Sequence, residues 1–167
     1  MEDNTLLDIV KGAILLEHKG KALYESVVQT TKVEAVKELF AWLAKEEEKH
    51  IGFLEKQFKR LAKGQGYDVS GFEDGHAETA KMILTEEIVD NVFSAGYEAA
   101  VISAALEFEK KAVKFYSQQA DTAQSDEEKE VFRWLTKWEK THMQMLAEVD
   151  DELKQKIWFN NQFWPLD

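Results

Sequence analysis

The chain has 167 residues, of which 44% are hydrophobic and 32% charged, and its formal net charge is −11. This length suits one well-packed domain over residues 1–167, and this composition excludes wholesale disorder. The acidic charge argues against nucleic acid and anionic membranes as partners, and the absence of cysteine excludes disulfides, zinc knuckles, iron–sulfur clusters and thiol catalysis.

The first half of the chain predicts two long helices. Apolar residues recur at helical spacing over about residues 6–28 and again over about residues 33–61. Four of the eight glycines then fall between Gly64 and Gly75, which indicates a connecting segment over about residues 65–95. A weaker amphipathic stretch predicts a short helix over about residues 79–92 within this connection.

The second half repeats this organisation. Helical spacing returns over about residues 96–120 and 127–157, and an aromatic tail follows at residues 158–167. The single proline, Pro165, lies in that tail, so no proline interrupts a predicted helix. We therefore predict an all-α four-helix bundle in which two helical hairpins are joined by a long crossover. The tail is too apolar to stay in water and should pack on the bundle or on a second subunit.

The sequence shows no targeting or membrane-spanning signal. Its first residues are acidic and include no apolar signal core. No apolar run approaches the roughly 20 residues that a membrane span needs. We therefore expect a cytoplasmic protein that does not associate with membranes.

The two halves are related at an offset of 92 residues. Without any gap, about fifteen of the 52 positions from Ala13 to Gly64 are identical to the residue 92 positions later. Because chance would match only a few, the bundle is predicted to be a duplicated hairpin, with repeat halves of about residues 6–64 and 96–156. A duplication implies an approximate two-fold axis, and any polar residue that faces this axis occurs twice.

Six polar residues occupy heptad positions that normally hold apolar core side chains. In each half, one glutamate lies on the first helix and a Glu-x-x-His motif lies on the second. The offset of 92 relates the members of the two halves to one another. Gly20 and Ala112 follow the first-helix glutamates by one turn and should leave room in the middle. The six residues are Glu17, Glu47, His50, Glu109, Glu139 and His142.

This set favours a site for two metal ions. Burying four carboxylates together is costly unless a positive charge compensates for their lost hydration. Two divalent cations carry the four positive charges that balance them, and neutral histidines add none. Glu-x-x-His places both side chains on one helix face, so each hairpin can offer a bridging carboxylate and a terminal nitrogen. A mixed set of oxygen and nitrogen ligands suits iron or manganese better than zinc or calcium.

Each motif taken alone has a simpler structural interpretation. A single Glu-x-x-His in an acidic stretch such as Glu46 to Glu48 is usually a solvated helix face, and a single glutamate at a core position is more often an exposed edge residue. The coincidence of all six residues in one helical phase and at one offset favours the metal site. His18 points away from this face, and His76 lies in the connecting segment, so neither is included. Glu107 competes with Glu109, but its repeat counterpart is Leu15.

Two tyrosines share the same helical face. Tyr24 and Tyr116 lie two turns after Glu17 and Glu109 and are themselves related by the offset of 92. They either pack in the core with a satisfied hydroxyl group or donate a hydrogen bond to a ligand carboxylate. Trp42, which the offset pairs with Trp134, falls one position off this face and is interpreted as a packing residue.

The duplicated hairpins and their six polar residues resemble the ferritin-like di-iron carboxylate proteins, whose ligand pattern is the same. Within that superfamily, the strings from Leu16 to Tyr24 and from Glu109 to Tyr116 are similar to the rubrerythrin branch. The resemblance extends from about Leu6 to Leu153. It implies a di-iron site that reacts with hydrogen peroxide or dioxygen, and in that site we expect Glu47 and Glu139 both to bridge the two ions. It also implies a homodimer.

The sequence departs from rubrerythrins in two respects. Rubrerythrins carry a C-terminal rubredoxin with four cysteines, and because this chain has none, the reducing electrons are expected to come from a separate protein. Rubrerythrins also carry an extra glutamate one turn after the third-helix ligand, where this chain has Ala112. That extra ligand belongs to the redox-linked iron movement of the rubrerythrin peroxidases.

Three functional hypotheses follow. The leading one is a rubrerythrin-like non-haem di-iron oxidoreductase, of peroxidase or ferroxidase type and connected with oxidative stress, that holds two iron ions, with manganese as the alternative metal. The second is an iron-handling ferroxidase or metal-binding protein without a dedicated reductant. The third is a structural bundle in which the polar layer only determines helix register.

Overall fold

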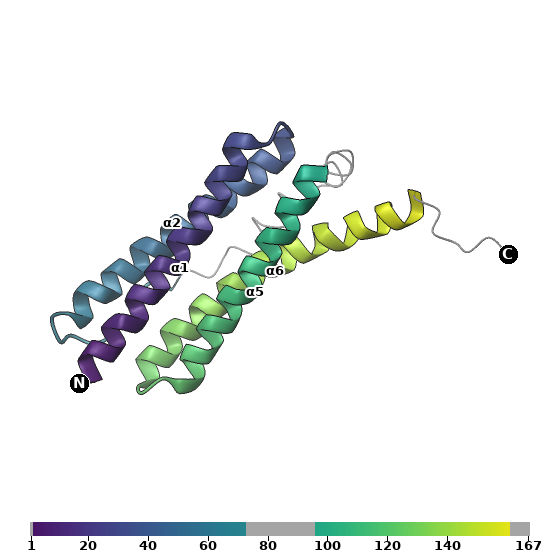
Figure 1. Ribbon diagram of the computed structural model, residues 1–167. Helices are drawn as coiled ribbons and strands as arrows, with labels where there is room; N and C mark the ends of the chain where they lie inside the picture. The colour runs from purple at the N-terminus through teal and green to yellow at the C-terminus, as the bar shows by residue number, and fades with distance from the viewer. Residues whose placement is uncertain (1, 73–95, 161–167) are drawn as a thin grey trace.

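A computed structural model describes residues 2–72 and 96–160, and every regular element in these ranges is a helix (Figure 1). Helices α1 and α2 lie side by side as one antiparallel hairpin, and α5 and α6 form the second. The two hairpins also contact each other, chiefly through α1 and α5. The prediction of an all-α four-helix bundle is therefore confirmed. The helices are α1 Glu2–Thr30, α2 Glu34–Leu61, α5 Gly96–Thr122 and α6 Asp126–Asn160.

The helices agree with the predicted ranges to within a few residues. The main difference is at the end of α6, which continues to Asn160, so the first three residues of the predicted aromatic tail are helical. Nothing in the sequence stops the helix there, because Pro165 is the only proline. Figure 1 shows this end of α6 extending past the other helices. The short helix predicted over residues 79–92 and the rest of the tail lie outside the described residues.

Short connections inside each hairpin keep its two helices antiparallel. The α1–α2 turn is held by the Thr31 hydroxyl, which accepts a hydrogen bond of 3.2 Å from the Val33 amide. At the start of α6, the Ser125 hydroxyl accepts a bond of 3.1 Å from the Glu128 amide, and a Glu128 carboxylate oxygen accepts one of 2.8 Å from the Gln124 amide. The first of these bonds satisfies an amide that the first turn of α6 leaves without a helical partner, and the second holds the residue before the cap against the same turn. None of the described helices combines the length and the apolar character needed to cross a membrane.

The apolar core of the bundle is divided into two clusters. One contains Tyr24, Phe40, Ile102 and Leu146 with their neighbours, and every helix contributes to it. The other also draws on all four helices, and its buried members include Val10, Leu54, Tyr116, Phe132 and Leu135. Along each helix, buried glutamates and histidines lie between the two clusters. The fold therefore places a polar layer between two dry apolar layers, where water cannot compensate for buried charge.

Candidate metal centre

All six sequence-predicted residues lie in the polar layer, and each is at most 2% exposed. Glu17 comes from α1 and Glu109 from α5, while the two Glu-x-x-His motifs come from α2 and α6. The 3-residue spacing in each motif directs Glu and His to the same side of the helix, one turn apart. The structure thus brings the six side chains together from four helices.

The six side chains form two overlapping groups of possible metal ligands. One group contains Glu17 and His50 and the other contains Glu109 and His142, while Glu47 and Glu139 belong to both. Within each group the ligand atoms lie within 4.8 Å of one another. Two shared carboxylates with one separate carboxylate and one histidine on either side make a nearly symmetric arrangement for two cations.

Both histidines direct Nδ1 toward the carboxylates. His50 Nδ1 lies 2.9 Å from Glu139 Oε1, 3.3 Å from Glu17 Oε2 and 3.7 Å from Glu47 Oε2. His142 Nδ1 lies 3.5 Å from Glu139 Oε2, 3.6 Å from Glu109 Oε1 and 3.8 Å from Glu47 Oε1. Each Nδ1 atom therefore faces both shared carboxylates and the separate glutamate of its own hairpin. This identifies Nδ1 as the nitrogen that could bind a metal.

The two tyrosines cross from one hairpin to the other. The Tyr24 hydroxyl of the first hairpin donates a hydrogen bond to Glu109 Oε1, and the Tyr116 hydroxyl of the second donates one to Glu17 Oε1. Both tyrosines are also fully buried in the apolar clusters, so both interpretations offered by the sequence apply at once. A hydrogen bond to one carboxylate oxygen fixes the orientation of the other oxygen.

Three tryptophans surround the histidine rings. The Trp42 ring lies 5.5 Å from the His142 ring, and Trp138 lies 5.1 Å from His50, both edge to face. Trp134 lies 6.2 Å from His50 in the same manner. Sequence reasoning assigned Trp42 and Trp134 to packing and did not single out Trp138. The spacing of four residues from Trp134 through Trp138 to His142 was the signal that could have found it.

The pKa values within the layer reflect crowded buried charges. Burial, reinforced by Glu139, raises the pKa of Glu109 to about 8, and burial together with Glu17 raises that of Glu47 well above its usual value. Burial alone lowers the pKa of a histidine, but at His142 the neighbouring glutamates outweigh it and raise the pKa to about 9. Glu139 is the exception, because both histidines hold its pKa below the usual value despite burial.

The residues present fit a pair of metal ions. Buried atoms without a hydrogen-bond partner include Glu47 Oε1, Glu109 Oε2, Glu139 Oε2 and His142 Nδ1. Buried polar atoms are normally paired, and an unpaired one costs roughly 1–3 kcal/mol. Several such atoms converge on one place, and all of them are metal-ligand types. Cations between them would satisfy the atoms and neutralise the carboxylates.

The competing residues lie elsewhere. The Glu107 side chain is 64% exposed and pairs with Lys110, and His18 is exposed. His76 lies outside the described residues. The room left by Gly20 is occupied by the Phe108 ring, whose Cε1 lies 2.7 Å from where a Cβ atom would be, and Glu47 Cδ lies 3.5 Å from the same point. Ala112 is buried and offers no ligand atom.

A family model described as Rubrerythrin matches residues 8–150, which include α2, α5, most of α1 and α6, and all six polar residues. No curated protein and no solved structure matches the chain.

Proposed function

Because this chain belongs to the rubrerythrin family, we propose that it is a non-haem di-iron oxidoreductase that reacts with hydrogen peroxide or dioxygen. The observation that carries the proposal is the pair of overlapping ligand groups that share Glu47 and Glu139. Shared carboxylates hold two metal ions close together, as a reaction that moves two electrons requires. Oxygen and nitrogen ligands, with no sulfur, suit iron, with manganese as the alternative.

Each residue has a distinct role in this proposal. Glu47 and Glu139 would bridge the ions, because each lies in both groups. The separate carboxylates and the histidines, through Nδ1, would complete the ligands of one ion each. When bound, the iron pair supplies two electrons to an oxidant. The residues proposed to hold the first ion alone are Glu17 and His50, and those for the second are Glu109 and His142.

The rest of the layer controls protons and water. Tyr24 and Tyr116 hold the separate carboxylates by donated hydrogen bonds, and burial raises the pKa of both hydroxyls, so they stay protonated donors. Tryptophan rings cover the histidines and limit the access of water. The residues thus keep a preorganised and dry environment for the ions.

The reaction needs electrons from outside the chain. Reduction of one hydrogen peroxide molecule to two water molecules consumes two electrons and two protons. No cysteine is present to store electrons as a dithiol. We therefore propose a separate electron-donating protein as the partner.

Anaerobic iron addition tests this proposal. Two equivalents of ferrous iron per chain should bind, and addition of peroxide should then produce the near-ultraviolet absorption of an oxo-bridged diferric pair. Glu107→Gln serves as the control, because Glu107 is an exposed glutamate outside the layer. A featureless spectrum together with an absence of bound metal would overturn the proposal.

One observation favours the second candidate, an iron-handling ferroxidase without a dedicated reductant. Ala112 lies buried where rubrerythrins have an extra glutamate, so the chain lacks the side chain associated with peroxidase turnover in its family. Repeated addition of iron and oxidant separates the two functions. An oxidoreductase is re-reduced with two irons in place, whereas an iron-handling protein takes up more than two irons per chain or releases them.

A further inference from the structure

Two surface grooves lie at equivalent places on the two hairpins. The groove between α5 and α6 has a volume of about 500 Å³, and the groove between α1 and α2 has one of about 420 Å³. Seven lining residues of one correspond to seven lining residues of the other at the repeat offset of 92. The repeated fold therefore produces this groove twice. Where the side chains of the two copies differ, the fold itself does not require the difference.

The two copies differ in charge. Ala41 and Glu48 in the first groove are replaced by Arg133 and Lys140 in the second. The first groove is neutral, with two lysines and two glutamates, and its Lys21 pairs with Glu48. The second groove contains three cations and one carboxylate. A positive groove is unexpected on a chain whose net charge is −11.

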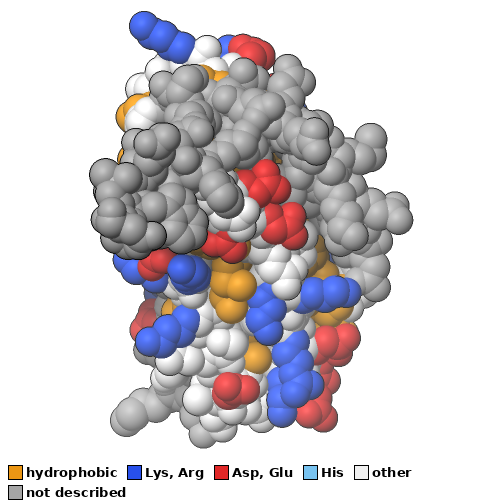
Figure 2. Space-filling model, turned by 90° about the vertical axis from the view of Figure 1, so that its right-hand side faces the viewer, with side chains coloured by type: hydrophobic (Ala, Val, Ile, Leu, Met, Phe, Trp, Pro, Cys, Tyr) orange, Lys and Arg blue, Asp and Glu red, His pale blue; other side chains and the backbone are white. Residues whose placement is uncertain are grey.

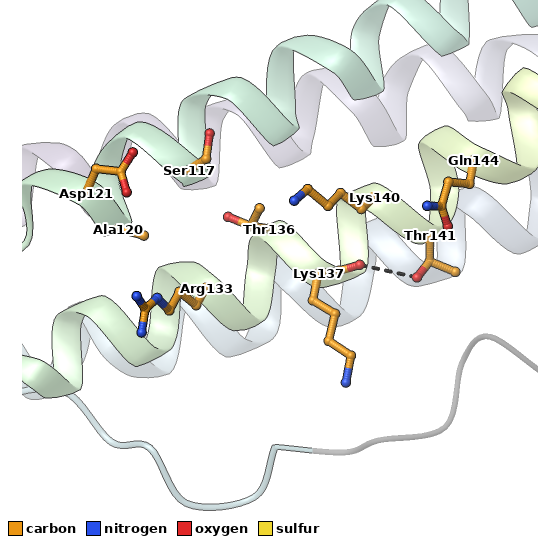
Figure 3. Close-up of a pocket in the computed structure, with 9 residues that line it drawn as sticks. All are labelled: Ser117, Ala120, Asp121, Arg133, Thr136, Lys137, Lys140, Thr141 and Gln144. Carbon is orange, nitrogen blue, oxygen red and sulfur yellow. Dashed lines mark hydrogen bonds between the residues drawn. The ribbon is translucent and has the colours of Figure 1, made fainter.

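Two cations of the second groove, Arg133 and Lys140, are the ones that could meet a partner. Arg133 and Lys140 form no ion pair with any residue in the described part of the chain. Figure 3 shows the Lys140 side chain extending from α6 toward α5, where Ser117 and Asp121 lie. Figure 2, which shows the right-hand side of Figure 1, has several Lys and Arg side chains close together on the lower part of that face. Among the described residues, Arg133 and Lys140 thus offer positive charge to an acidic ligand.

The hydroxyl groups of the groove are already occupied as donors. Ser117 donates to the Lys114 carbonyl at 3.1 Å, Thr136 to the Phe132 carbonyl at 2.7 Å, and Thr141 to the Lys137 carbonyl at 3.2 Å. A hydroxyl has one proton, so these groups cannot also donate to an anion. Long flexible cations therefore dominate recognition. Such cations suit the widely spaced carboxylates of a protein surface better than a small anion, because a small anion needs several convergent donors.

The groove lies along the same stretch of α6 that carries the candidate metal ligands Glu139 and His142. Lys140 directly follows Glu139, and the buried Thr136 lies one turn before Lys140. A partner in the groove is then separated from the polar layer by about one helix width, roughly 10–12 Å. We propose that this groove, through Arg133 and Lys140, docks an acidic one-electron-carrying protein. This inference rests on the proposed function. Two docking events deliver one electron each, which together with two protons reduce one peroxide molecule to two waters.

The experiment replaces the two differing cations by their counterparts in the first groove, as Arg133→Ala with Lys140→Glu. The control variant, Lys59→Ala with Lys63→Glu, makes the same change in charge at two exposed lysines of the other hairpin. The probe is a plant-type [2Fe–2S] ferredoxin, an acidic one-electron donor. Its binding to the full-length protein is measured by fluorescence anisotropy, and the oxidation rate of its reduced form by the iron-loaded protein is measured by stopped flow.

Removal of the groove charge should weaken ferredoxin binding and lower the second-order oxidation rate by about 10-fold at low salt, and the difference should shrink at high salt. The control variant should change both by less than about twofold. Equal effects of the two variants, no effect of the groove variant, or no ferredoxin binding to the wild-type chain would overturn the docking inference. Binding of inorganic phosphate in this groove, without binding of ferredoxin, would also overturn it. Peroxide turnover with dithionite as reductant tests the proposed function separately, because it needs no docked protein.

Discussion

The Tyr116 hydroxyl donates a hydrogen bond to a carboxylate oxygen of Glu17, which belongs to the other hairpin. The repeat relates this pair to Tyr24 and Glu109, which make the same bond in the opposite direction. The hairpins are therefore joined at the polar layer by two reciprocal hydrogen bonds as well as by apolar packing. Residues that orient a metal ligand in this manner affect the metal as well as the fold.

Replacement of the tyrosine hydroxyls should weaken metal binding. Tyr24→Phe and Tyr116→Phe keep the buried ring but remove the donor to Glu109 or Glu17, and each should lower metal affinity by about 10- to 100-fold. Titration with cobalt(II), followed by its visible absorption, measures the effect. Tyr97→Phe is the control, because Tyr97 is 48% exposed and its hydroxyl bonds Thr30 and not a glutamate of the layer. Unchanged affinity in both layer variants would remove the proposed orienting role.

Shared and separate carboxylates should differ in their effect on stoichiometry. Glu47→Gln and Glu139→Gln remove a residue present in both ligand groups, so binding of both ions should weaken. Glu17→Gln removes a residue of one group only and should leave one ion bound per chain. Metal analysis after gel filtration measures the ratio. Loss of both ions in Glu17→Gln, or of neither in Glu47→Gln, would contradict the assignment of bridging residues.

Metal affinity should rise with pH. Without metal, Glu109 has a pKa of about 8 and His142 one of about 9, so both hold protons at neutral pH. A metal ion must displace these protons, and its binding is therefore favoured as pH rises and levels off above about pH 9. Manganese(II) titrations between pH 6 and 9 measure the trend. If the affinity falls or stays constant between pH 6 and 9, the predicted competition between protons and metal is wrong.

Metal removal should lower the thermal stability. The ions bind only the folded layer, so at a concentration 100 times Kd each ion stabilises the fold by about 2.7 kcal/mol. For a chain of this length, treatment with EDTA should then lower Tm by roughly 5–10 °C for each ion removed. Differential scanning calorimetry with and without EDTA measures the shift. The structural hypothesis predicts an unchanged Tm, so this experiment separates it from both metal hypotheses.

Most of the fold and the composition of the polar layer could be predicted from the sequence. Hydrophobic periodicity locates the helices because one face of each is buried, and the same phase assigns Glu47 and His50 to that face. The offset of 92 adds a second, independent reason to choose Glu109 over Glu107. The helix boundary at Asn160 was missed because apolar aromatic residues are compatible with either a helix or a tail.

The sequence by itself determined the four helices, their duplication and the six side chains that face inward, because helical phase is a local property of the chain. Only the tertiary structure decided which partner each side chain meets. Phase does not specify that Tyr24 crosses to Glu109, or that Phe108 fills the space beside Gly20, because both depend on how one hairpin is positioned against the other. That position is set by packing among residues far apart in the sequence, where no local pattern records it.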